Sequence, residues 1–539
     1  MRSRTTRRVA AVTAASALAL GFAGCGGGGG ASGKGSASSA ALRIAWASTP
    51  TQLDPNEFTG LTWVYGLDGF METLLDYDTS KAADGKVLGV DALKPALAES
   101  FEANEDKTQY TFKLRQGVKS EWGNELDADD VIWSFERMFT NPRSLQAGVL
   151  LPTANVDKQE PWTKVDQYTV RYNLTDPSAV SLSVLAYPIL GIVDSDEAKK
   201  HATKDDPWAA EWLKTNSASF GAYKLKSLDP GRELRLEYNS NYWGPRPAFE
   251  EIVIKAVPDA SSRAQLLISG DVDMISEPPI DQLKKIDESA NAAVSRQPDS
   301  NRHNLSVNVK DPALGKPKVR QAISHAINRE AIVNSIYQGY AQSALSPQAS
   351  ALLADQPKTG SYDPDRAKQL LAEAGHPNGF DMTVAFNTAR PGPFAENLGR
   401  LIQSDLQKVG INVNLKAIPS AADFEAAVSK QEYQAYLYSE RPSQPDPGFS
   451  LFLYLYSESA LNKSGYNNPE FDRLVTTVLK QPSGPQREQV VNQAIEFLVG
   501  EEPIISLVEV PDLVGVAENV KGYVALPTGG VKFDELKRS

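Results

Sequence analysis

The chain has 539 residues, of which 41% are hydrophobic, and a formal net charge of −12 at pH 7. This length is too great for a single hydrophobic core, so we expect two or three structural units. The acidic balance argues against nucleic acid and against electrostatic adhesion to anionic lipid, because both partners are negatively charged. With one cysteine, the chain has no disulfide within itself, so a large core must stabilise it.

The first 24 residues have the pattern of an export signal. Residues 1–8 contain four arginines, and residues 9–19 form an apolar run that is too short to span a bilayer. Small residues then lead to Cys25, the single cysteine, and this arrangement resembles a bacterial lipobox. We predict that residues 1–24 are a lipoprotein signal peptide and that Cys25 is lipidated, which anchors the protein at the extracytoplasmic face of the cell membrane. The alternative is a core cysteine. Paired arginines at 7 and 8 leave open whether export follows the general or the twin-arginine route.

A low-complexity segment follows the cysteine. Residues 26–30 are all glycine, and residues 31–40 are small, with a single lysine among them. Such a composition cannot bury enough apolar surface to fold. We therefore predict a flexible Gly/Ser tether at residues 25–41. One acyl chain anchors a protein only marginally, so stable anchoring requires two or three chains.

The first half of the remaining chain mixes strand and helix patterns. Residues 42–46 read as a buried strand, and residues 111–115 and 168–174 alternate between apolar and polar side chains as half-exposed strands do. Asp127 is placed to cap a helix that has acidic residues in its first turn. The apolar residues expected on one face of this helix are Ile132, Phe135 and Phe139.

The second half has longer helical patterns. Residues 318–337 are expected to form one helix, and a second helix should begin after Asp363 and end at Gly375. A third helix is expected to stop at Gly410, and residues 411–415 then alternate as a strand. No fixed repeat period is present, which argues against a solenoid, and α/β structure in more than one lobe is expected. The apolar side chains expected along the third helix are Phe394, Leu398, Leu401, Ile402 and Leu406.

No pattern indicates catalytic chemistry. The chain has four histidines, none at metal-ligand spacing and none with a cysteine partner that would complete a zinc site. The Gly-x-Ser-x-Gly elbow that carries the nucleophile of serine hydrolases is absent. Adjacent acids such as Asp129 and Asp130 are typical of capping turns. We therefore expect a binding protein without metal or cofactor, not an enzyme.

Six segments in chain order resemble one family, the extracytoplasmic solute-binding proteins of family 5, which serve dipeptide, oligopeptide and nickel ABC importers. The similarity extends over residues 42–525 and departs from the family pattern at residues 120–122. The six segments are residues 110–139, 221–243, 263–273, 318–339, 362–379 and 466–472.

The resemblance implies an α/β, two-lobed fold like that of periplasmic binding proteins, of type II and of the large three-domain subclass, with a hinge and an interlobe cleft. Lobe I is expected to comprise residues 42–76, 205–300 and 498–539. Domain II, inserted in it, should be residues 77–204, and lobe III should be residues 301–497.

The resemblance also implies a function. The chain would be the lipid-anchored, monomeric solute-binding component of an ABC importer, which captures a peptide or similar small solute between closing lobes and delivers it to a permease with its ATPase subunits. Two alternatives stay open. One is a lipid-anchored receptor or chaperone on the same scaffold that acts in signalling, and the other is an importer receptor for a non-peptide solute such as a sugar.

The resemblance leaves the ligand open. In peptide-binding members of the family, an aspartate three residues before an acidic-Pro pair meets the free amino group of the peptide. Counting back from Asp446 leads to Ser443, which is not an acid, and Glu440 stands where the family has a tryptophan. Either Glu440 or Asp446 binds the amine, or the ligand has none.

Arg441 offers a bidentate fork for a carboxylate or phosphate, unless it forms an exposed pair with Glu440. Aromatic side chains line pockets as well as cores. The candidate pocket aromatics are Trp63, Tyr436 and Tyr438.

Overall fold

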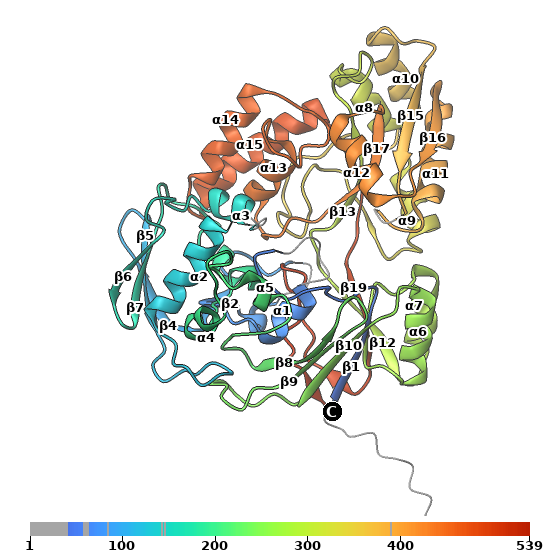
Figure 1. Cartoon of the computed structure of the whole chain (residues 1–539). Helices are drawn as coiled ribbons and strands as arrows, with labels where there is room; N and C mark the ends of the chain where they lie inside the picture. The colour runs from blue at the N-terminus through green and yellow to red at the C-terminus, as the bar shows by residue number, and fades with distance from the viewer. Residues whose placement is uncertain (1–40, 58–63, 83–85, 142–143, 145–146, 389–390) are drawn as a thin grey trace, which may run out of the picture. The chain divides into compact units, whose positions relative to one another are not determined.

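The computed structural model of the chain describes residues 41–57, 64–82, 86–141, 144, 147–388 and 391–539 (Figure 1). Cys25, the rest of the expected signal and tether up to residue 40, and Trp63 lie outside the described residues. The described residues all belong to one compact unit. No helix in the described part of the chain is long and apolar enough to cross a membrane.

A seven-stranded sheet contains β1, the strand expected at residues 42–46, in its middle. β1 pairs in parallel with β10 on one side and β11 on the other, and Leu42 and Ile44 on it are completely buried. Helices α6 and α7 lie beside this sheet (Figure 1). The sheet has the order β12-β19-β11-β1-β10-β9-β8, with β1 at Ala41–Trp46, β8 at Tyr223–Asp229, β9 at Glu233–Tyr238, β10 at Glu251–Ala256, β11 at Met274–Ser276, β12 at Ala292–Gln297, β19 at Asp512–Ala517, α6 at Ala260–Ser269 and α7 at Leu283–Asp287.

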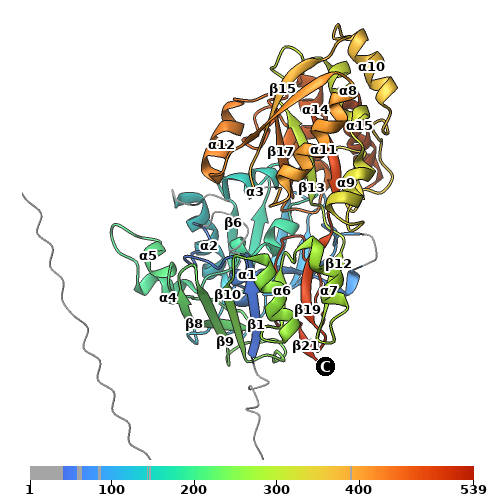
Figure 2. The same cartoon turned by 90° about the vertical axis from the view of Figure 1, so that its right-hand side faces the viewer.

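A six-stranded sheet contains most strands of the second half. Helices α8 to α12 surround it (Figure 2). Its order is β14-β18-β13-β17-β15-β16, with β13 at Arg302–Val307, β14 at Gln342–Ser343, β15 at Phe380–Phe386, β16 at Ile411–Ala417, β17 at Ala435–Glu440 and β18 at Ile504–Glu509.

Residues 504–509 pair with β13 of the six-stranded sheet, whereas β19 pairs with β11 and β12 of the other sheet. Residues 498–539, which are expected to belong to lobe I, therefore contribute a strand to each of the two large sheets.

The region between residues 98 and 173 contains a four-stranded antiparallel sheet. Helix α2 packs on it and begins where expected, because Asp127 accepts a hydrogen bond from the backbone of Asp129 and forms a capping box with Asp130. Phe135 of α2 is buried, and Ile132 is half-buried. The elements are β4 at Ala98–Ala103, β5 at Gln109–Leu114, β6 at Trp162–Asp166, β7 at Thr169–Asn173 and α2 at Ala128–Thr140.

The helix expected over residues 318–337 is broken in two. Asn328 leaves helical geometry, and its side chain accepts a hydrogen bond from the backbone of Ala331, so it caps a new helix. The buried guanidinium of Arg329 donates to the carbonyl oxygen of Ser324, which the break leaves without a helical partner, and to that of Ser506. The helices of this region are α8 at Pro317–Ala326, α9 at Arg329–Ile336, α10 at Pro364–Glu373, α11 at Ala395–Gln407 and α12 at Ala421–Lys430.

The end of helix α14, in the segment expected to belong to lobe III, contacts the inserted region. The side chain of Asn155 donates a hydrogen bond to the carbonyl of Leu479, and Lys480 forms an ion pair of 3.0 Å with Asp176. The helices of this part of the chain are α13 at Pro447–Leu455, α14 at Pro469–Leu479 and α15 at Pro485–Glu501. The remaining short elements are α1 at Val64–Phe70, β2 at Leu75–Tyr77, β3 at Leu93–Pro95, α3 at Ala147–Thr153, α4 at Ser195–Lys200, α5 at Ala210–Leu213, β20 at Val520–Lys521 and β21 at Lys537–Arg538.

Candidate functional site

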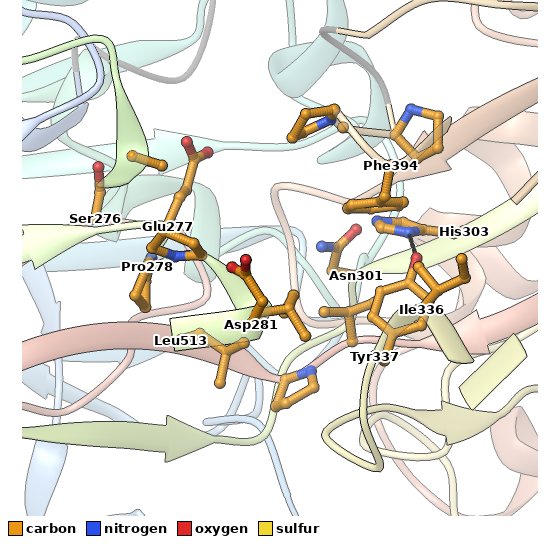
Figure 3. Close-up of a pocket in the computed structure, with 18 of the residues that line it drawn as sticks. Ser276, Glu277, Pro278, Asp281, Asn301, His303, Ile336, Tyr337, Phe394 and Leu513 are labelled. Atoms are coloured by element: carbon orange, nitrogen blue, oxygen red, sulfur yellow. Dashed lines mark hydrogen bonds between the residues drawn. The ribbon is translucent and has the colours of Figure 1, made fainter. Parts of the chain in front are cut away.

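A cavity of about 870 Å³ lies where the chain crosses between the two large sheets. β12 runs through residues 298–301 into β13, and β18 runs through residues 510–511 into β19. Both crossings contribute lining residues, and the rest come from both sheets and from the helices and loops next to them. A solute in this cavity would therefore touch both parts of the molecule (Figure 3).

One wall of the cavity follows β11. Glu277 comes directly after this strand and has a left-handed backbone with a φ of 46°, an uncommon conformation for a residue with a side chain. The guanidinium of Arg263 fixes this turn, because it donates to the carbonyl oxygens of Ser276 and Glu277 and, behind them, to those of Val257 and Pro258. Figure 3 shows Glu277 and Asp281 on this side of the cavity, with Leu513 nearby.

The opposite wall is aromatic and apolar. His303 on β13 forms a hydrogen bond between its Nδ1 and the hydroxyl of Tyr337, and the ring of Phe394 stacks on it at a centroid distance of 5.6 Å. Tyr337 meets Phe394 edge-on at 5.2 Å. Burial lowers the pKa of His303 to about 3, so the imidazole is neutral at physiological pH. Ile336 completes this wall (Figure 3).

Arg441 lies at the edge of the cavity, where the chain crosses between the sheets. It pairs with Asp299 at 3.0 Å and with Asp512 at 3.5 Å. Burial raises the pKa of Asp299, and the positive charge of Arg441 opposes this rise. The guanidinium of Arg441, which was expected to bind a carboxylate or phosphate of the ligand, thus already contacts two carboxylates of the protein, those of Asp299 and Asp512.

The two acids proposed to bind an amine each have an arginine partner. Glu440 pairs with Arg302 at 2.9 Å, and burial raises the pKa of the Glu440 carboxyl. Asp446 pairs with Arg487 at 2.7 Å and caps α13 by accepting a hydrogen bond from the backbone of Phe449. Neither acid is among the residues that line the cavity.

Ser443 lies between these acids and is half-buried. Its neighbour Gln444 is completely buried and accepts a hydrogen bond of 2.7 Å from the hydroxyl of Ser183. The segment after β17 is therefore attached to the inserted region by a polar contact.

The two tyrosines of β17 belong to a small core under α12, which they form with Phe424, Val428 and Ala385. Tyr436 is completely buried, and its hydroxyl donates to the carbonyl of Ala427. The hydroxyl of Tyr438 donates to Glu425. Among the candidate residues in the described part of the chain, the structure thus brings Arg441 to the cavity and places the two tyrosines elsewhere.

Sequence reasoning missed the residues that form the two walls. Phe394 was assigned to the apolar stripe of a helix, and His303 was considered only as a metal ligand. Glu277 and Asp281 were not singled out. A histidine within a buried strand was the one available signal, because such a residue needs a specific polar partner.

A second cavity, of about 750 Å³, also borders the crossing segments. Arg296 lies over the ring of Tyr340 there, 4.9 Å from its centroid, and Ser350 donates its backbone N–H to Glu509. Among the described residues, no group of three or more histidine, cysteine, aspartate or glutamate side chains is arranged to hold a metal ion.

A family model described as bacterial extracellular solute-binding proteins, family 5, middle, matches residues 92–462. Heme-binding protein A of Haemophilus influenzae is 29% identical over 458 residues, which are 81% of this chain and 82% of that protein. The dipeptide-binding protein of Escherichia coli is 29% identical over 474 residues, 83% of this chain and 87% of that protein.

Solved structures share the fold over nearly the whole chain. The structure of HbpA2 from Haemophilus parasuis has a TM-score of 0.79 and 26% identity, and the match covers 93% of this chain and 100% of that one. The periplasmic binding protein DppA of Helicobacter pylori, in complex with the peptide STSA, has a TM-score of 0.78 at 24% identity and covers 92% of this chain and 98% of that one. The expected α/β fold of the periplasmic-binding-protein type is confirmed.

Proposed function

The chain belongs to the bacterial extracellular solute-binding proteins of family 5 and is the solute-binding component of an ABC importer, and we propose that it captures its solute in the cavity between the two large sheets. In this proposal the sheets approach each other around the solute, and the closed form delivers the solute to a membrane permease.

The observation that carries the proposal is the double lining of the cavity. Glu277 and Leu513 belong to the seven-stranded sheet and its loops, whereas His303 and Phe394 belong to the six-stranded sheet and its helices. A solute shifts an open–closed equilibrium only if it binds one state better than the other. Contacts to both walls supply that difference, and a shift from mostly open to mostly closed requires about 5.5 kcal/mol.

The class of solute is part of the proposal. Relatives include a heme-binding protein, a dipeptide-binding protein and a glutathione-binding protein, so the scaffold accommodates chemically different ligands. In this chain Ser443 replaces the acid that would meet a peptide amine, and Glu440 and Asp446 are engaged with arginines. A peptide or similar solute whose amino group is not bound by Ser443, Glu440 or Asp446 fits these residues best.

We also propose how the protein is attached to the membrane. A thiol at Cys25, after a segment with the pattern of an export signal, supports a lipid anchor at the extracytoplasmic face, and we propose that the protein acts there as a monomer.

Small molecules released from the purified, denatured protein and identified by mass spectrometry will name the solute. Small-angle scattering of the intact protein with and without that solute should show a smaller radius of gyration when it is bound, and the melting temperature should rise with solute concentration. An unchanged radius at saturation would contradict capture by closure.

A further inference from the structure

The cavity between the two large sheets has an uneven distribution of charge. Four carboxylates and two guanidinium groups line it. Arg441 neutralises part of the acidic charge because it contacts both Asp299 and Asp512. Arg263 is buried and directs its donors at four backbone carbonyl oxygens.

Two of the four carboxylates stay available to a ligand. Glu277 is 77% exposed in its side chain, and its nearest cation, the guanidinium of Arg263, is 4.0 Å away. Asp281 is exposed, and its carboxylate has no hydrogen bond or ion pair to any residue in the described part of the chain. The two lie four positions apart on one wall, and both face the cavity (Figure 3).

The opposite wall provides a surface of another kind. Phe394 and Ile336, both half-buried, present apolar area to the cavity, and the buried ring of Tyr337 packs behind them. His303 is only 4% exposed, and its Nδ1 is engaged with Tyr337. Its Nε2 has no hydrogen-bond partner among the described residues. Because the ring lines the cavity, this nitrogen is a polar atom that a ligand could contact.

We propose that the cavity binds an organic cation with an aromatic or branched apolar body. The proposal rests on the function proposed above. The cationic group lies between Glu277 and Asp281, the apolar body packs on Phe394 and Ile336, and a polar atom of the ligand meets Nε2 of His303.

This arrangement accounts for the serine at position 443. The negative charge that meets an amine is not in the segment after β17 but on the wall of the seven-stranded sheet, after β11. The cation then contacts one sheet and the apolar body contacts the other. Such a ligand bridges the two walls, which is the requirement for a shift toward the closed state.

The test uses the intact purified protein and three probes that share a phenyl ring. 2-Phenylethylammonium carries a cation, 3-phenylpropanoate carries an anion, and arginyl-phenylalanine presents the cation as part of a peptide. We expect calorimetry to detect binding of at least one cationic probe and none of 3-phenylpropanoate. Binding of 2-phenylethylammonium assigns the site to small amines in general, whereas binding of arginyl-phenylalanine alone assigns it to peptides.

Variants then locate the cation. The double variant Glu277→Gln, Asp281→Asn should bind the cationic probe at least tenfold more weakly, because it removes both charges and keeps the shape of both side chains. Glu288→Gln is the matched control, since Glu288 is an exposed acid of the same region that does not line the cavity. Its affinity should be unchanged, and equal melting temperatures of the variants show that both are folded.

Three results would overturn the inference. They are the failure of both cationic probes to bind, tighter binding of 3-phenylpropanoate than of either cation, and an undiminished affinity in the double variant. The proposed function is judged separately, by compaction with the solute recovered from the protein, so it survives if that solute is neutral or anionic and still closes the sheets.

Discussion

Arg302 on β13 and Glu440 on β17 lie opposite each other in the register of the six-stranded sheet and form a buried ion pair of 2.9 Å. Nε and Nη1 of Arg302 have no hydrogen-bond partner among the described residues, so Glu440 alone compensates the charge of the guanidinium. A charge buried with one partner depends strongly on it. The structure thus gives Glu440 a role in stability.

We expect Glu440→Gln to lower the free energy of unfolding by about 3–5 kcal/mol, since it leaves the guanidinium of Arg302 buried without a counter-charge. Urea denaturation measures the change. The double variant Arg302→Met, Glu440→Leu should recover much of the loss because it removes both charges. If Glu440→Gln leaves stability unchanged but abolishes solute binding, the residue serves the ligand and not the sheet.

Asp446 combines a helix cap with a charge pair, and two substitutions separate these roles. Asp446→Asn keeps a side chain able to cap α13 but removes the counter-charge of the buried Arg487. Asp446→Ala removes both, so it should be less stable than the asparagine variant by about 1 kcal/mol, the typical value of an N-cap. Thermal unfolding of the three proteins at one pH measures the difference. Equal stability of the two variants would show that the cap contributes nothing.

Stability should depend on pH through Glu72. This buried carboxyl lies near Lys532 and Asp76, and burial raises its pKa from 4.5 to about 8. The folded chain therefore holds the proton more tightly than the unfolded chain, so the contribution of Glu72 to stability is fully present below pH 4.5 and is lost as the pH rises to about 8.

The loss amounts to at most about 1.4 kcal/mol per pH unit for one carboxyl. Glu72→Gln should flatten the dependence of the melting temperature on pH between about 5 and 8, because it removes this titrating group. Melting curves of both proteins across that range make the comparison. An equally steep dependence in the variant would assign the effect to other groups, such as the neighbouring Asp68, whose pKa burial also raises to about 8.

Gly221 should not tolerate a side chain. A Cβ at this position would lie 2.2 Å from the carbonyl oxygen of Phe70, and backbone atoms cannot easily move away. We expect Gly221→Ala to destabilise the protein by about 1–3 kcal/mol. Gly500→Ala is the matched control, since this helical glycine has open space around it and should gain about 0.5–1 kcal/mol. Similar effects of both substitutions would contradict the close approach at Gly221.

Lipidation is tested at Cys25, the single thiol of the chain. Cys25→Ala should either release the protein into the medium or leave it unprocessed in the membrane, because the acceptor of the lipid is gone. Fractionation of producing cells, with mass spectrometry of the N-terminus, distinguishes these outcomes from the parent protein. A variant that stays processed and membrane-bound would show that another feature anchors it.

Helix starts and single strands could be predicted from the sequence where the residues that determine them are neighbours in the chain. The capped start of α2 at Asp127, the capped start of α10 at Asp363 and the strand that became β16 all follow from neighbouring residues. The break at Asn328 was not predicted, because the apolar stripe continues through it. The cap by Asn328 and the contact of Arg329 with β18 together favour a second helix over one long helix.

The sequence by itself determined the α/β class, the resemblance to a family of solute-binding proteins and the absence of an acid at Ser443. These depend on residue identity and spacing along the chain. Only the tertiary structure decided that Glu440 and Asp446 face arginines far away in sequence, and that Glu277 faces His303 and Phe394 across a cavity. Sheet register and the crossing of the chain bring these residues together, and neither leaves a periodic signal in the sequence.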